Sequence, residues 1–177
     1  MVSLPKPRQK GLAVASVVTM RLFKRSAGEE PAPASPAPPA QDPVLEPLTN
    51  AETDWVRSNI AALADQDVTL GDIDDLGRHY DEMLSGWLRL TDSQRPDPND
   101  VITQIGLAFG QYVGDHAKLD WTIATDDYGA EIGLHRPRES SVLVYPTAMV
   151  SQCWAAEELH ALPALARDMI ATIDQLP

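Results

Sequence analysis

The side chains that could do chemistry gather in the middle of the sequence, around one short turn. They combine carboxylates, aromatic rings and guanidinium groups: Trp121, Asp126, Asp127, Tyr128, Glu131, Arg136, Arg138 and, further along, Tyr145. A hydrolase with paired carboxylates needs one acid protonated and the other ionised across a cleft. Adjacent turn residues usually point apart into water instead. The pattern therefore favours a solvated turn first, a binding surface second and catalysis last.

The other residues give little support for metal binding, for cofactor binding or for nucleophilic catalysis. The four histidines occur in separate segments, without the His-x-x-x-His spacing of a zinc site: His79, His116, His135 and His160. The turn also lacks the alternating acids and the later Glu of an EF-hand. Cys153 is the only cysteine, which excludes an intrachain disulfide and a Cys-based structural zinc site. Since its neighbours in the sequence offer no base, we expect a packed thiol, and we predict no cofactor.

The turn lies inside residues 119–134, whose pattern predicts a β-hairpin. Apolar residues alternate along both runs, so that they share one face of each strand: Leu119, Trp121 and Ile123, then Ala130, Ile132 and Leu134. Gly129 can take the positive φ that a type I turn followed by a bulge requires. The alternating apolar pattern and the residues of the turn therefore both predict a hairpin.

Two helices are expected before the hairpin. Thr49 and Glu52 have the spacing of a capping box, which predicts a helix from Thr49 to about residue 65. The clearest helical period in the chain follows over residues 72–90. Its apolar residues recur in steps of three and four: Ile73, Leu76, Tyr80, Met83, Trp87 and Leu90. We interpret this stripe as core.

A third helix, expected over residues 97–115, carries a row of glycines. Gly106, Gly110 and Gly114 recur every four residues. Each costs about 1 kcal/mol relative to Ala in a helix interior. Close approach of the hairpin or of another helix, where any Cβ would clash, would offset that cost. We therefore expect tight packing along this row.

These elements predict an α+β fold. A short third strand is expected at residues 141–145, followed by a turn of helix over 147–154 and an amphipathic helix after Pro163. The order gives helices packed on one face of a small three-stranded antiparallel sheet. We expect a single domain over residues 48–177.

The N-terminal segment differs in composition. Residues 1–25 carry six basic and no acidic residues, and residues 26–47 hold seven of the fifteen prolines. We expect residues 1–47 to form a disordered tail and linker, because they offer too little apolar surface to fold. The apolar run over residues 12–20 is too short to span a membrane. Two interpretations stay open: translation begins at Met20, or the basic segment touches an anionic membrane.

The charge of the remaining chain limits its partners. Residues 26–177 contain 26 acidic and 8 basic residues, a net charge of −18. Such acidity repels phosphate backbones, so we exclude nucleic acid as a partner of the folded part. A basic protein partner stays open, because complementary charge speeds encounter.

Four short motifs occur in order along the central part of the chain. They are a glycine-spaced stretch at 105–110, Leu-Asp-Trp at 119–121, Thr-Asp-Asp-Tyr-Gly at 125–129, and an apolar strand at 142–145 followed by Pro-Thr-Ala-Met-Val at 146–150. Together they resemble the bacterial family known as domain of unknown function 3806, over roughly residues 70–160. The resemblance implies a domain of that family without supplying an activity.

We interpret the chain as a small, acidic, cytoplasmic bacterial domain that acts by binding, as an adaptor or immunity protein would, rather than as an enzyme. The expected binding surface is the exposed side of the hairpin with the loop from Arg136 to Arg138. The alternative is a small-ligand-binding or hydrolytic domain. Its pocket would lie beside the glycines of the third helix and would be lined by Trp121, Asp126 and Tyr145. The sequence leaves the oligomeric state open.

Overall fold

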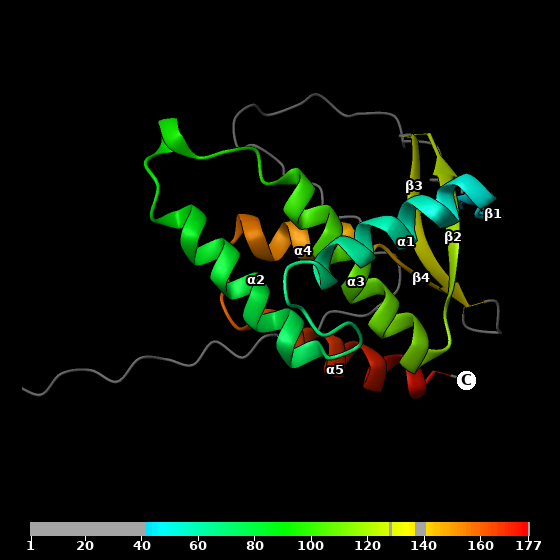
Figure 1. The fold of residues 1–177 in the computed structure, drawn as a ribbon. Coiled ribbons are helices and arrows are strands. Elements are labelled where there is room, and N and C mark those ends of the chain that lie inside the picture. Colours follow the sequence, from blue (N-terminus) through cyan, green and yellow to red (C-terminus); the bar gives the residue numbers. More distant parts are fainter. Residues whose placement is uncertain (1–41, 128, 137–140, 177) are drawn as a thin grey trace, which may run out of the picture.

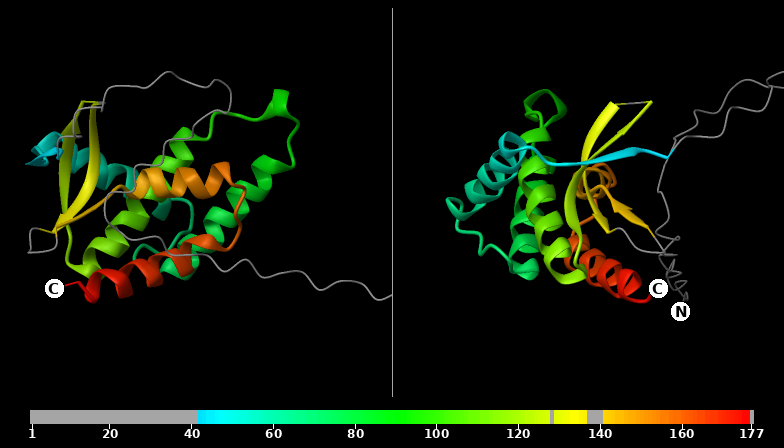
Figure 2. Two further views of the ribbon diagram at one scale, coloured as in Figure 1. Left: turned by 180° about the vertical axis from the view of Figure 1, so that it is seen from behind. Right: turned by 90° about the vertical axis from the view of Figure 1, so that its right-hand side faces the viewer.

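The computed structural model describes residues 42–127, 129–136 and 141–176 of the 177-residue chain. Its elements are, in order, β1 (Val44–Pro47), α1 (Asn50–Ala64), α2 (Ile73–Leu88), a 3₁₀ turn (Asp92–Gln94), α3 (Asn99–Ala117), β2 (Asp120–Asp126), β3 (Gly129–Arg136), β4 (Val142–Val144), α4 (Pro146–Ala155) and α5 (Ala161–Asp174) (Figure 1). The helices gather on one side of the sheet, as Figure 1 and the left view of Figure 2 show. The predicted α+β class is therefore confirmed.

The four strands form one antiparallel sheet in the order β1-β2-β3-β4. β2 and β3 are the predicted hairpin, in which Trp121 lies opposite Leu134 and Ile123 lies opposite Ile132. The predicted number of three strands was wrong, because β1 pairs with the outer side of β2.

β1 lies within the segment that the sequence assigned to the linker. Pro43 precedes this strand and Pro47 is its last residue, so its composition is that of an extended linker. Proline is tolerated there because an edge strand has one row of N–H groups that no neighbouring strand needs. Four residues are also too few for an alternating pattern to be recognised. Residues 1–41 lie outside the described part of the chain, and their disorder stays a prediction.

The predicted helix starts are largely confirmed. At α1, the Thr49 hydroxyl accepts a hydrogen bond from the Glu52 amide at 3.3 Å, and the Glu52 carboxylate accepts one from the Thr49 amide at 2.7 Å. This is the predicted capping box. At α3 the helix begins at Asn99, two residues after the predicted start, and Asp97 accepts a hydrogen bond from the amide of Asn99 at 3.0 Å. Of the helices in the described ranges, none has the length and apolar character needed to cross a membrane.

The glycines of α3 allow the close approach that their spacing predicted. A Cβ on Gly106 would lie 2.7 Å from Cα of Thr147 at the start of α4. A Cβ on Gly110 would lie 2.6 Å from Cη2 of Trp121 and 2.7 Å from Cγ of Pro146. Any side chain at these positions would clash, so the row lets α3 pack directly against both the hairpin and α4.

The core is formed by α2, α3 and the two C-terminal helices, together with residues of α1, β3 and β4. Tyr80 is fully buried and meets Trp154 edge-on, with ring centroids 5.9 Å apart. The Tyr80 hydroxyl donates a hydrogen bond to the carbonyl of Glu158 at 3.1 Å, so this buried polar group is satisfied. The predicted apolar stripe is thus core over most of its length: Met83 and Trp87 are half-buried against the core, and Leu90 lies beyond the end of α2 and is exposed.

Candidate functional site

The acidic residues of the hairpin are brought together in part. Strand register places Asp126 and Glu131 on the same face of the hairpin, because Glu131 pairs with Ala124 and side chains alternate along each strand. Burial raises the pKa of the Glu131 carboxyl, and the negative charge of Asp126 raises it further. Asp127 is exposed in the turn itself. The described residues at this end of the hairpin therefore include three carboxylates.

The predicted aromatic residues take part in packing. Trp121 is half-buried against the backbone of Gly110, and its indole N–H donates a hydrogen bond to the side chain of Gln111 at 3.1 Å. Tyr145 is half-buried at the start of α4, with its ring beside Gly133. The space beside the α3 glycines, where the sequence suggested a pocket, is thus filled by side chains.

Arg136 lies inside the protein rather than on its surface. Its side chain is buried at 7% exposure, and Nη2 donates a hydrogen bond to the carbonyl of Ile173 at 2.9 Å. Ile173 is in the last turn of α5, where a positive charge is favoured by the helix dipole. Arg136 therefore connects β3 to the end of α5. The two other predicted site residues, Tyr128 and Arg138, lie outside the described residues.

A groove of about 490 Å³ lies elsewhere, between α2 and the start of α5. Most of its side chains carry charge or polar atoms: Asp74, Arg78, Asp81, Glu82, Ser85, Arg89 and His160, with Gly77 and Pro163. Its volume is within the range of small-molecule sites. We refer to it as the α2–α5 groove.

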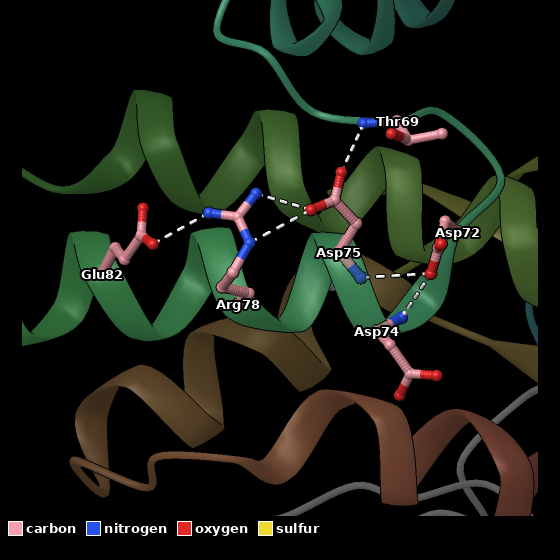
Figure 3. A network of polar contacts seen from close by, with 6 residues as sticks. All are labelled: Thr69, Asp72, Asp74, Asp75, Arg78 and Glu82. Carbon is pink, nitrogen blue, oxygen red and sulfur yellow. Dashed lines mark hydrogen bonds and ion pairs between the residues drawn. The ribbon is translucent and has the colours of Figure 1, made fainter.

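Two residues of the α2–α5 groove, Arg78 and Glu82, belong to a network of ion pairs along α2 (Figure 3). Asp75 accepts hydrogen bonds from the backbone amide of Thr69 at 2.7 Å and from Nε of Arg78 at 3.1 Å. Arg78 also donates to Glu82 at 2.8 Å. The Thr69 amide, and after it Arg78, lower the pKa of Asp75 to about 2. Arg78 is therefore occupied by two carboxylates.

An aspartate–histidine pair joins α2 to the start of α5 in the same groove. Asp81 accepts a hydrogen bond from the backbone amide of His160 at 2.8 Å, and its second oxygen lies 2.5 Å from Nδ1 of the imidazole. The Asp81 side chain is 16% exposed, whereas that of His160 is 85% exposed. One carboxylate thus fixes the ring through Nδ1, and the other ring nitrogen is left for an external group.

The sequence contained only part of the signal for this groove. Residues 74, 78, 81, 85 and 89 recur in steps of three and four, which places them on one face of α2 opposite the apolar stripe. A polar face is expected of any amphipathic helix, so the spacing alone indicated no site. His160 follows α2 by more than seventy residues, and only the tertiary fold brings it to Asp81.

The remaining reactive groups are poorly placed for chemistry. Burial, followed by the charge of Glu158, raises the pKa of the Cys153 thiol to about 11, so the thiol stays protonated at neutral pH. Burial lowers the pKa of His79. Across residues 42–127, 129–136 and 141–176, no group of three or more His, Cys, Asp or Glu side chains could hold a metal ion.

Comparisons with known proteins give one match. No curated protein and no solved structure matches the chain. The family model covers Ser85, Arg89 and His160 of the α2–α5 groove together with the whole hairpin, and it ends as α5 begins. Residues 84–162 match the family described as Domain of unknown function (DUF3806), which confirms the resemblance found in the sequence.

Proposed function

We propose that the chain is a non-enzymatic protein-binding module of the bacterial cytoplasm, of adaptor or immunity type, and that its partner is basic. The partner surface is the acidic end of the hairpin. We call Asp126, Asp127 and Glu131 the hairpin carboxylates. The proposal rests on the negative charge of this surface, and it requires no cleft.

The observation that carries the proposal is the placement of three carboxylates at one end of the hairpin, where Asp126 and Glu131 share a face and Asp127 is exposed in the turn. Glu131 is itself exposed, and partial desolvation, followed by the charge of Asp126, raises the pKa of its carboxyl. A cation from a partner would remove this cost by neutralising the charge. A basic partner should therefore gain more from this surface than from an isolated exposed acid.

The overall charge supports the same partner chemistry. The described residues include 23 acidic and 7 basic side chains. Arg136 is buried, and Arg57, Arg78, Arg95 and Arg167 each lie within 4 Å of a carboxylate oxygen. Little positive charge is thus available to neutralise the surface, and a basic partner would be steered towards it.

Capture by an isosteric variant tests this proposal. The variant Asp126→Asn/Asp127→Asn/Glu131→Gln removes the charges of the hairpin carboxylates while keeping their shape. Tagged full-length protein is used to capture partners from a lysate of its native host. We expect the unaltered chain to retain a basic protein in stoichiometric amount, and the variant to lose at least about tenfold in affinity, as for a desolvated charge pair.

Stability and a second variant control this experiment. Because the pKa of Glu131 is raised in the folded state, its contribution to stability is complete below its ordinary pKa and is lost as pH rises through the raised value. Removing its charge should therefore not lower the melting temperature at neutral pH. The control Asp65→Asn/Asp168→Asn/Asp174→Asn changes three exposed acids elsewhere and should keep the partner. Equal capture by both variants would contradict the proposed surface.

A further inference from the structure

We propose that the α2–α5 groove is a second binding site, which holds a small molecule through an anionic group, a carboxylate or a phosphate. The anion would be bound by Arg89, His160 and Ser85. This site is independent of the hairpin carboxylates and of any protein partner that they bind.

The carboxylates that line the groove are already paired. Asp74 accepts a hydrogen bond from Arg167 at 2.6 Å, Asp81 holds His160, and Glu82 accepts one from Arg78 at 2.8 Å. These carboxylates offer little to a cationic ligand, because each already pairs with an arginine or a histidine. A ligand must use the groups that remain.

The groups that remain are donors. Arg89 is exposed and forms no ion pair with any residue in the described part of the chain. Nε2 of His160 is not used by Asp81, which binds the other ring nitrogen, and it donates a hydrogen bond to an anion when the imidazole is protonated. Ser85 lies between Asp81 and Arg89 on the same face of α2, and it adds a half-buried hydroxyl to the groove. A guanidinium, an imidazole and a hydroxyl are side chains that bind carboxylates and phosphates.

The backbone positions these donors along one face of α2. Ser85 follows Asp81 by one helical turn, and Arg89 follows Ser85 by another. Nη2 of Arg89 would lie 3.8 Å from a Cβ placed on Gly86, so the guanidinium turns back along the helix over Gly86.

The Asp81–His160 pair gives the site a fixed element. His160 has a left-handed backbone, with φ of 61°, which non-glycine residues adopt only when their surroundings hold them there. Asp81 does so by accepting from both the amide and the imidazole of His160. At the floor of the groove, the ring of Pro163 lies directly on Gly77, where a Cβ would be 2.6 Å from Cγ. The imidazole is thus pre-oriented beside a direct contact between α2 and α5.

Size and net charge restrict the ligand to a small molecule. A volume of about 490 Å³ suits a metabolite-sized ligand. A polyanion would extend beyond the groove, and the described residues as a whole include 23 acidic and 7 basic side chains, which would repel it. A small anion would meet only the nearest charges, because others beyond about 10 Å are screened at ordinary salt.

Titration with two simple anions tests the site. Inorganic phosphate and acetate are added separately to the ¹⁵N-labelled full chain at constant ionic strength and pH, and amide and imidazole resonances are followed by NMR. We expect saturable shifts at Ser85, Arg89 and His160, with half-saturation below about 10 mM. Tighter binding of phosphate would assign a phosphorylated ligand, and tighter binding of acetate a carboxylate. Either result supports the proposal.

Matched variants separate binding at the groove from general charge effects. Arg89→Gln should weaken the anion roughly tenfold, as expected for loss of one charge-assisted contact, and Arg89→Lys should restore part of it. Arg57→Gln, which removes an exposed arginine on α1, should change nothing. Non-saturating shifts, or equal binding by Arg89→Gln and the unaltered chain, would overturn the proposal. Since Arg89 is exposed and unpaired among the described residues, loss of fold does not confuse the result.

Discussion

At the scale of single residues, two helical glycines have opposite surroundings. Gly110 in α3 lies against Trp121 and Pro146, whereas a Cβ on Gly86 in α2 would meet only the mobile end of Arg89 at 3.8 Å. Gly110 lies in the interior of α3 and Gly86 in the last turn of α2, and Ala is favoured over Gly inside a helix by about 1 kcal/mol. The space around each glycine therefore decides whether a substitution to alanine stabilises or destabilises the protein.

We predict that Gly110→Ala destabilises the protein. Its Cβ would lie within 2.7 Å of two ring systems, so that the hairpin or α4 must move, which costs about 1–3 kcal/mol beyond the helix gain. Gly86→Ala is the matched control and should be neutral or slightly stabilising. Denaturant unfolding of the unaltered chain and of the two variants measures the change in the free energy of unfolding that each substitution causes. Equal stabilities for the two variants would show that α3 does not approach the hairpin closely.

At the scale of elements, α5 is fixed by polar contacts at both ends. Asp81 holds His160 just before the helix, and Arg136 donates to the carbonyl of Ile173 in its last turn. In the middle, Arg167 pairs with Asp74 at the surface. The buried contact should contribute most, because water competes less with it.

We predict that Arg136→Met loosens the end of α5. The carbonyl of Ile173 would lose its donor, and the free energy of unfolding should fall by about 1–2 kcal/mol. Hydrogen exchange should become faster in the last turn of α5, while partner capture should be unchanged. Arg167→Met, at an exposed pair, should have little effect. If Arg136 belonged to the binding surface, capture would be lost at constant stability instead.

The elements that the sequence predicted are those with a local signal. The capping box of α1, the apolar period of α2 and the alternation of the hairpin each need only neighbouring residues. β1 was missed because a four-residue edge strand ending in Pro47 has no such pattern. The position of Arg136 was also unpredictable, because its partner is a carbonyl of a helix that begins 25 residues later. The groove depends in the same way on a distant pairing, that of Asp81 with His160.

At the scale of the whole molecule, charge is the dominant property. The described residues contain 23 acidic and 7 basic side chains. In most of the few surface ion pairs of arginine, both partners belong to the same helix and lie three or four residues apart. Repulsion among the unpaired acids opposes compact folding. Exposed ion pairs offset little of this repulsion, since each contributes less than about 1 kcal/mol.

We therefore predict that salt stabilises the protein at neutral pH. Raising sodium chloride from about 10 mM to about 100 mM shortens the Debye length from about 30 to about 10 Å, which screens acids spread over the surface more than contacts at hydrogen-bond distance. The melting temperature should rise. In the variant Asp65→Asn/Asp168→Asn/Asp174→Asn, which carries three fewer negative charges, the rise should be smaller. A melting temperature that falls with salt would mean that the local ion pairs along α2 outweigh the net charge, and that the acidic surface is less repulsive than its composition indicates.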